Sequence, residues 1–415
     1  MPNYAELPTG VTLETEIFKV AIPQDQQQHL LNLVRASKLG PQTYENTGGD
    51  GKYGLTYKWM SEAKSYWENS FDWAAVEKRI NAFPNFMAKV IDDDGSSHDI
   101  HFMGLFSEKK EAIPIMCIHG WPGSFMEFAG MLSSLSAKYT PDELPYHVII
   151  PSMPGYAFSA TPAVNKNWTM QDTGRLLHKL MLGLGFEAGY ALQGGDIGSY
   201  TARIMASRYE ACKVNFCIMT CPDEATHGKL ELQDIEREAL ARAVDFGKFG
   251  TAYAMAHSTK PSTIGFVLSS SPLALLAWIG EKFLTWTDDT PSMDEILASV
   301  TLYWLTNTFP SSIYPYRQEI DDEPHQQKTD DDLRLVFQTG PKKYMPHADP
   351  ALYCRQPLGY SFFPYEIGAI PKSWVATTGN LIWSNYHRKG GHFAAMEQPV
   401  ALLEDVESFL KQVWI

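Results

Sequence analysis

Several features that mark whole classes of protein are missing from this sequence. Its 415 residues contain no CxxC pair, and the five cysteines, at positions 117, 212, 217, 221 and 354, are scattered. We therefore expect free thiols in a reducing compartment, the cytoplasm, rather than disulfides or a zinc site. Basic residues are also in deficit, since 34 Lys and Arg stand against 48 Asp and Glu and give a formal net charge of −14. Nucleic acids and anionic membranes would repel such a chain, so we expect neither as a partner.

Long apolar segments are missing as well. Residues 1–18 have neither the basic region nor the apolar run of a signal peptide, so we expect no secretion. Residues 261–280 carry no charge, but a triple serine followed by Pro272 divides them into pieces of about ten residues, too short to cross a bilayer. We expect two buried helical segments there and no membrane anchor. The longest acidic cluster, residues 321–332, is typical of a solvated loop.

What the sequence does contain is an alternation of apolar runs with helical segments. Two early runs flank the turn-rich DDDG at 92–95 and predict a hairpin. The later runs end in loops and glycines, as buried parallel strands do. Strand, loop, helix and strand together predict a doubly wound, mostly parallel α/β sheet. The expected strand regions are 86–91, 99–106, 113–120, 146–159, 189–196, 211–220 and 372–383.

The alternation divides the chain into four regions. Residues 1–85 contain three tryptophans in amphipathic helical spacing and predict a segment that wraps a larger body. Residues 86–223 and 346–415 form the two parts of the α/β core, and residues 224–345 read as a helical cap inserted between them. We expect this cap above the carboxyl ends of the strands, where open α/β sheets hold their ligands.

Asp196 is the first candidate for chemistry. It lies within GGDIGS (194–199), after an apolar run and before a helical segment. This is the pattern of the nucleophile elbow of α/β-hydrolases, with Asp in place of Ser, and no GxSxG occurs in the chain. Aspartate is also a good helix N-cap, so the pattern alone leaves a purely structural role open.

A second motif, HGWP (119–122), follows the run at 113–118. It resembles the HGxP oxyanion loop of epoxide hydrolases. In that loop the amide of the third residue, here Trp121, joins the amide of the residue after the nucleophile, here Ile197. Two such donors stabilise the oxyanion of a tetrahedral intermediate. We interpret His119 itself as a structural histidine that bonds neighbouring backbone.

The third motif is RKGGHFAAMEQP (388–399). His392 follows two glycines at the start of the last helical segment, which is where α/β-hydrolases hold their general base. Glu366, 26 residues earlier, is the candidate acid that orients His392. Asp349 lies in a proline-rich loop and is less suited, while an exposed loop carboxylate is the alternative interpretation of Glu366.

Taken together, the chain resembles the microsomal-type epoxide hydrolases over nearly its whole length, close to soluble fungal members. The resemblance is carried by HGWPGSFMEF, GGDIGS and GGHFAAMEQP, by FDWAAVEKRINAFPNFMAKV near the N-terminus, and by AYAMAHSTKPSTIG in the cap. It implies that Tyr253 and Tyr316 donate to the oxirane oxygen, with Tyr314 as a rival for the second position. It also implies a homodimer.

The implied enzyme is an ether hydrolase that converts an apolar epoxide and water to a vicinal diol. Asp196 would form a covalent ester, which water activated by His392 and Glu366 would hydrolyse. No metal or organic cofactor is expected, and no HExxH, P-loop or strand-linked GxGxxG occurs. Detoxification and biosynthesis are equally compatible roles.

Two alternatives are weighed against this activity. A haloalkane dehalogenase shares the elbow, but usually places a tryptophan directly after the nucleophile, where this chain has Ile197. A non-catalytic binding protein on the same scaffold is the other alternative. Such proteins usually break the triad, whereas Asp196, Glu366 and His392 are all present.

Overall fold

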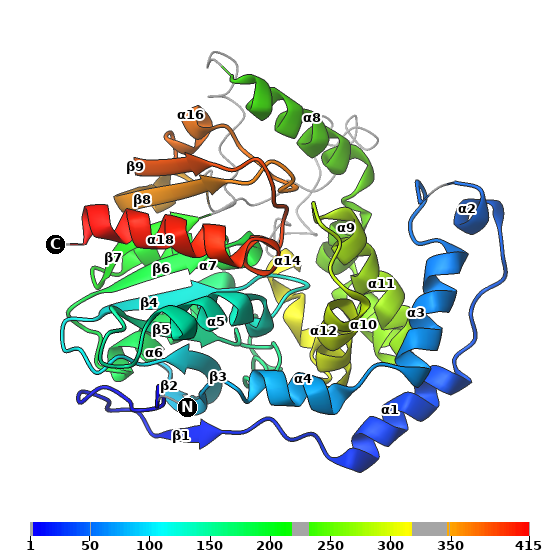
Figure 1. Cartoon of the computed structure of the whole chain (residues 1–415), viewed down its shortest axis with the longest axis horizontal. Coiled ribbons are helices and arrows are strands. Elements are labelled where there is room, and N and C mark those ends of the chain that lie inside the picture. Colours follow the sequence, from blue (N-terminus) through cyan, green and yellow to red (C-terminus); the bar gives the residue numbers. More distant parts are fainter. Residues whose placement is uncertain (1–2, 50, 218–231, 318–346, 348, 415) are drawn as a thin grey trace, which may run out of the picture.

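The computed structural model describes residues 3–49, 51–217, 232–317, 347 and 349–414. Its centre is a nine-stranded sheet in the order β1-β2-β3-β5-β4-β6-β7-β8-β9 (Figure 1). The first three pairings are antiparallel, and all pairings from β5 to β9 are parallel, which confirms the predicted mostly parallel α/β sheet. The strands are β1 (Thr15–Phe18), β2 (Asn85–Ile91), β3 (Ser97–Leu105), β4 (Ile113–Ile118), β5 (Tyr146–Pro151), β6 (Tyr190–Gly194), β7 (Cys212–Cys217), β8 (Cys354–Phe362) and β9 (Gly379–Tyr386).

The central strands are buried on both faces. In β4, Met116 and Ile118 belong to the apolar cluster that includes α6 and α7, whereas Ile115 and Cys117 belong to the cluster that includes α5 and α18. This alternation follows from the two-residue period of a strand, and it explains why β4 to β6 read as continuous apolar runs. The core helices are α5 (Ala129–Lys138), α6 (Met170–Gly183), α7 (Asp196–Arg208), α16 (Lys372–Val375), α17 (Ala394–Glu397) and α18 (Pro399–Val413).

The N-terminal segment joins the core to the cap. Its strand β1 pairs with β2 at the sheet edge, and its helices lie beside the cap helices (Figure 1). Trp67 and Trp73 are buried, and the ring of Trp59 lies close to Gly280 in the cap. These tryptophans therefore pack the segment onto a larger body. The helices are α1 (Gln24–Ala36), α2 (Tyr44–Thr47), α3 (Tyr57–Asn69) and α4 (Trp73–Ile80).

The cap follows β7 in the chain and is helical. The uncharged stretch forms two helices, α10 and α11, with an angle of 117° between them. The expectation that both are buried holds for α11 and is wrong for α10, where Phe266 is 79% and Val267 50% exposed. No single described helix is long and apolar enough to cross a membrane, although this bent pair has the length and composition of a broken span. The cap helices are α8 (Asp234–Phe249), α9 (Ala252–Thr259), α10 (Pro261–Ser269), α11 (Pro272–Thr285), α12 (Met293–Thr306), α13 (Phe309–Ser312) and α14 (Tyr314–Arg317).

Three local expectations need correction. Neither β1 nor β8 is predicted from the sequence, because β1 has only four residues and β8 contains Pro357. Residues 372–383 are predicted as one strand, whereas α16 occupies Lys372–Val375 and β9 begins at Gly379. Cys221 and the acidic cluster at 321–332 lie outside the described residues.

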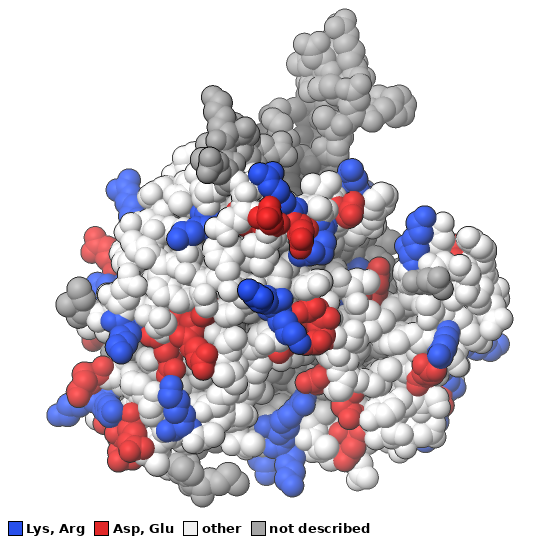
Figure 2. Space-filling model, turned by 45° about the horizontal axis from the view of Figure 1, so that its top comes forward, with Lys and Arg blue, Asp and Glu red and all other residues white. Residues whose placement is uncertain are grey.

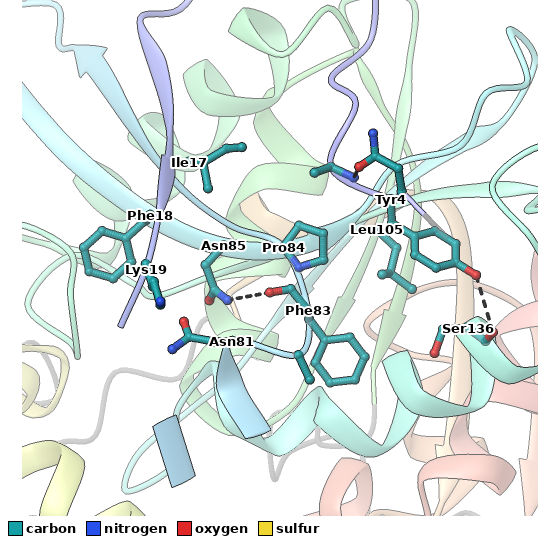
Figure 3. Close-up of a pocket in the computed structure, with 13 residues that line it drawn as sticks. Tyr4, Ile17, Phe18, Lys19, Asn81, Phe83, Pro84, Asn85, Leu105 and Ser136 are labelled. Atoms are coloured by element: carbon teal, nitrogen blue, oxygen red, sulfur yellow. Dashed lines mark hydrogen bonds between the residues drawn. The ribbon is translucent and has the colours of Figure 1, made fainter. Parts of the chain in front are cut away.

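The molecular surface shows two further features. Acidic and basic side chains are interspersed over the face drawn in Figure 2, without a large basic patch. A pocket of about 450 Å³ lies where the N-terminal segment meets the core, and Figure 3 shows Tyr4, Ile17 and Phe18 around it with Asn85 and Ser136. None of its lining residues belongs to the candidate catalytic set.

The predicted hairpin turn between β2 and β3 is fixed to helix α6 by a buried ion pair. The Arg175 guanidinium donates two hydrogen bonds to Asp92, of 2.7 and 2.8 Å, and the Asp92 side chain is only 1% exposed. The hydrogen bond from Arg175 outweighs burial and lowers the pKa of Asp92 well below its usual value. Because the folded pKa is depressed, this stabilisation is present at neutral pH and is lost as the pH falls.

Arg175→Met is expected to lower the free energy of unfolding by about 3 kcal/mol, because it leaves the Asp92 carboxylate buried without its bidentate partner. Chemical denaturation at pH 7 measures the loss. The double variant with Asp92→Asn is the control and should recover much of it, since no buried charge is then unpaired. Equal destabilisation of the single and double variants would contradict this account.

Candidate active site

Asp196 is the first residue of α7, and only Gly195 separates it from the end of β6. Its φ angle is +49°, in the left-handed region that residues with a side chain rarely adopt. A Cβ on Gly194 would lie 2.6 Å from the carbonyl oxygen of Gly198, and a Cβ on Gly198 would lie 2.2 Å from that of Ile118. The turn is therefore sharp and crowded, which is why glycines flank the aspartate.

The loop after β4 lies against the Asp196 carboxylate. The backbone amide of Trp121 donates to Oδ1 of Asp196 at 2.8 Å, and the amide of Ile197 donates to the same carboxylate. A Cβ on Gly120 would lie 2.3 Å from Oδ1, so only glycine admits this approach. Two backbone donors thus converge on one carboxylate, the arrangement that stabilises an oxyanion.

His119 has a structural environment. Its Nδ1 hydrogen-bonds the carbonyl of Gly120 at 3.0 Å, and its Nε2 accepts from the amide of Met153 at 3.2 Å. Burial lowers the pKa of His119 to about 4, so the ring is neutral at pH 7. As the sequence analysis expects, this histidine bonds neighbouring backbone.

His392 lies between two carboxylates. Its Nε2 is 3.4 Å from Oδ2 of Asp196, and its Nδ1 is 2.8 Å from Oε1 of Glu366. The side chains of His392 and Glu366 are 2% and 1% exposed. Asp349, the less suited acid of the sequence analysis, accepts a hydrogen bond from the amide of Ala351 at the start of a short 3₁₀ helix, η4 (Pro350–Leu352).

The two glycines before His392 shape its loop. Gly390 has a φ angle of +105°, and a Cβ on Gly391 would lie 2.7 Å from the carbonyl oxygen of Trp286 in the cap. That carbonyl accepts a hydrogen bond of 2.9 Å from the amide of His392. Glu397 accepts from the amide of Gly391 at 3.1 Å. The cap and the last helices thus hold the histidine loop together.

The charges in this site shift the pKa values of Asp196 and His392. Burial alone would raise the pKa of Asp196, but the hydrogen bond and charge of His392 outweigh it and lower this pKa. Burial alone would lower the pKa of His392, but the charges of Glu366 and Asp196 raise it well above its usual value. The resting site therefore favours an imidazolium between two carboxylates.

Two cap tyrosines face this site from different helices. Tyr253 of α9 and Tyr316 of α14 have ring centroids 5.7 Å apart, and the Trp121 ring stacks on Tyr253 at 5.3 Å. Burial raises the pKa of Tyr316 well above its usual value, so it is a neutral phenol at pH 7. Tyr314 is engaged elsewhere, because its hydroxyl hydrogen-bonds Thr173 of α6 at 2.5 Å.

Three polar residues near this site are not predicted from the sequence motifs. Lys282 of α11 holds its ammonium group 4.7 Å from the ring centroid of Tyr253, and His257 is fully buried beside Tyr316 with ring centroids 4.8 Å apart. Glu127 lies near Asp196 and His392. Two of them could have been found from the sequence. Lys282 is the only basic residue in an apolar helix, and Glu127 completes a Ser-x-x-Glu capping box that begins at Ser124.

No group of three or more His, Cys, Asp or Glu side chains in the described ranges is arranged to hold a metal ion. The residues brought together are two carboxylates, one histidine, two phenols and two backbone donors. This set can deliver a nucleophile, move a proton and stabilise an oxyanion.

Two family descriptions match the chain. Residues 15–128 match the family described as epoxide hydrolase N terminus, and residues 113–293 match the alpha/beta hydrolase fold. Epoxide hydrolase 1 of Sus scrofa is 30% identical over 428 residues, which cover 95% of this chain and 88% of that protein.

Solved structures show the same similarity. The Aspergillus niger epoxide hydrolase has a TM-score of 0.88 and 42% identity, with 99% of this chain and 100% of that chain covered. Juvenile hormone epoxide hydrolase from the silkworm Bombyx mori shares the fold, with a TM-score of 0.81 and 23% identity over 97% of this chain and 95% of that chain. The resemblance predicted from the motifs is confirmed, and the chain belongs to the epoxide hydrolase family, with the α/β-hydrolase fold.

Proposed function

We propose that this chain hydrolyses an apolar epoxide to a vicinal diol through a covalent ester on Asp196. The observation that carries the proposal is the position of this carboxylate, with one oxygen 2.8 Å from the Trp121 amide and the other 3.4 Å from His392 Nε2. A cluster of aromatic rings adjoins the site and favours an apolar substrate. It consists of Trp121, Tyr253, Trp286 and Tyr316, and Trp286 contacts the ring of His392.

In the first step Asp196 attacks one oxirane carbon and the carbon–oxygen bond of the ring breaks. The alkoxide is a poor leaving group, so its oxygen needs an acid. Tyr253 and Tyr316 hydrogen-bond that oxygen, and one of them gives it a proton. General acids of this kind contribute about 10²- to 10⁴-fold to a rate. The phenolate that forms lies near the Lys282 ammonium, which is 4.7 Å from the Tyr253 ring.

In the second step water attacks the carbonyl carbon of the ester. Once Asp196 is esterified it carries no charge, so one of the two charges that raise the pKa of His392 is gone. The imidazolium can then pass its proton, directly or through solvent, to the phenolate left by the first step, and the neutral imidazole held by Glu366 acts as the base. The amides of Trp121 and Ile197 receive the oxyanion. Formation of the ester thus produces the base that removes it.

His392→Gln is expected to form the ester and fail to hydrolyse it, because it removes only the base of the second step. Peptide mass spectrometry after incubation with terminal and aryl epoxides should find one epoxide mass on the peptide that contains Asp196. Asp196→Ala is the control and should acquire no adduct. Diol formation by the wild type without an adduct on His392→Gln would mean that water attacks the epoxide directly. Turnover of haloalkanes but not epoxides would favour the dehalogenase alternative.

Tyr316→Phe is expected to slow ester formation by at least about tenfold, since it removes one of two acids at the oxirane oxygen. Tyr314→Phe is the matched control two residues away and should leave that rate unchanged, because its hydroxyl bonds Thr173. Single-turnover quench experiments measure the rate of adduct formation. If Tyr314→Phe slows adduct formation and Tyr316→Phe does not, Tyr314 is the second acid and Tyr316 is not.

Asp196→Asn is expected to lower the pKa of His392 relative to the wild type. The substitution imitates the uncharged ester and removes one of the two carboxylates that stabilise the imidazolium. Titration of the imidazole signals by NMR measures the shift, with Asp349→Asn as a control for a carboxylate outside the site. An unchanged pKa of His392 in Asp196→Asn would contradict the link between the two steps.

We further propose a cytoplasmic homodimer. Four cysteines, Cys117, Cys212, Cys217 and Cys354, are free and buried in the described part of the chain, which fits a reducing compartment. The dimer rests on family resemblance alone, and light scattering of the purified chain tests it. Detoxification and biosynthesis differ in the breadth of the epoxides accepted, which a substrate panel measures.

A further inference from the structure

A small cavity lies beside Asp196 and His392. Its volume is about 20 Å³, which is room for one water molecule and too little for an epoxide. Tyr253 and Tyr316 do not line it, so it lies apart from the two phenols expected at the oxirane oxygen, although Trp121 lines it. Besides Asp196 and His392, its polar lining includes Glu127 and Gln193.

Gln193 is a buried polar side chain whose hydrogen-bonding groups are not all paired with other described residues. It lies on β6, three residues before Asp196, and is 1% exposed. Its side-chain oxygen has no hydrogen-bond partner among the described residues. A buried amide oxygen without a partner is destabilising by about 1–3 kcal/mol. A water molecule in the adjoining cavity would donate a hydrogen bond to this oxygen. If the side-chain amide is rotated by 180°, its NH2 group would donate to the water molecule instead.

Glu127 contributes a second polar group. Its Oε1 accepts a hydrogen bond of 3.1 Å from the amide of Ser124, which fixes the side chain at the start of a 3₁₀ helix, η1 (Phe125–Phe128). It keeps some accessible surface although protein surrounds it, as expected for a side chain that lines an internal cavity. Burial raises the pKa of Glu127 to about 8, against the opposing charge of His392. At neutral pH the carboxyl group therefore keeps its proton and can both donate and accept.

We propose that this cavity binds the hydrolytic water, and that Gln193 and Glu127 are the positioning residues that hold it for attack on the ester. The inference rests on the proposed ester mechanism and adds the place from which water enters it. A water molecule here adjoins both the carboxylate that becomes the ester and the histidine that becomes the base. Hydrogen bonds to Gln193 and Glu127 fix its orientation and leave one proton for His392.

The step balances without any further reactant. The water oxygen forms a bond to Cγ of Asp196, and one water proton passes to Nε2 of His392. The bond between Cγ and the alkoxy oxygen then breaks, and the departing alkoxide takes the proton from the imidazolium. Asp196 is left as a carboxylic acid, and its proton passes to the neutral His392, which restores the carboxylate and the imidazolium of the resting site.

The test separates the two half-reactions by rapid mixing and acid quench under single-turnover conditions, with styrene oxide as the probe and ester and diol measured at each time. Gln193→Met and Glu127→Met keep the size of each side chain and remove its hydrogen-bonding groups. Glu127→Gln restores a neutral donor and acceptor. Asn215→Leu is the matched control, because Asn215 is a fully buried amide on the neighbouring strand β7 and does not line the cavity.

Ester formation in Gln193→Met and Glu127→Met is expected to stay within about twofold of wild type, while ester hydrolysis falls by about tenfold or more, as for one lost hydrogen bond to a reacting group. Glu127→Gln should regain most of the hydrolysis rate, and Asn215→Leu should change neither step. A merely structural role would not slow ester hydrolysis while leaving ester formation unchanged, so accumulation of the ester distinguishes a positioning role.

Two results would overturn the inference while leaving the ester mechanism intact. One is normal ester hydrolysis in both Met variants, and the other is equal slowing of both half-reactions. Failure of the ester mechanism itself has a different signature, because then neither the wild type nor His392→Gln forms an adduct on Asp196 at any time.

Discussion

The left-handed backbone of Asp196 is the constraint on which the rest of the site depends. Its φ of +49°, one residue after Gly195, turns the chain from β6 into α7 and presents the carboxylate to the loop after β4. Such a conformation costs about 1–3 kcal/mol, so the surrounding structure must hold it in place. The parallel pairing of β4 with β6 does so, since Ile118 and Gly194 are register partners at the strand ends. The Trp121 amide then follows three residues after that register position.

Burial of the charged groups is the second constraint. Glu366 and His392 are buried, and the Asp196 side chain is only 14% exposed, in a site whose other walls are largely aromatic. Two carboxylates and one imidazolium leave a net charge of −1, and each charge is tolerated because an opposite one adjoins it. Alkylation of Asp196 changes this balance directly, which is a reason for an aspartate rather than a serine. A serine would give a stable ether, whereas the aspartyl ester has a carbonyl carbon that water can attack.

How much of this could be predicted from the sequence depends on how local each signal is. Asp196 and His392 lie on glycine-rich turns next to strong periodic elements, so short motifs mark them. The two cap tyrosines come from α9 and α14, and only the family resemblance selects them among 20 tyrosines, because their approach is a tertiary effect. Strand β8 was missed since Pro357 interrupts its pattern, and Gln193 looks like any residue of a buried strand.

The position of the cavity, which neither cap tyrosine lines, bears on a conflict between the two steps of the reaction. Activation of an epoxide by phenols benefits from exclusion of water, because a dry site strengthens each hydrogen bond to the oxirane oxygen. The second step nevertheless consumes a water molecule at the same carboxylate. A single open pocket would serve one step at the expense of the other. A cavity of about 20 Å³, lined by Gln193 and Glu127 but not by Tyr253 or Tyr316, admits one water molecule beside His392 without wetting the tyrosines.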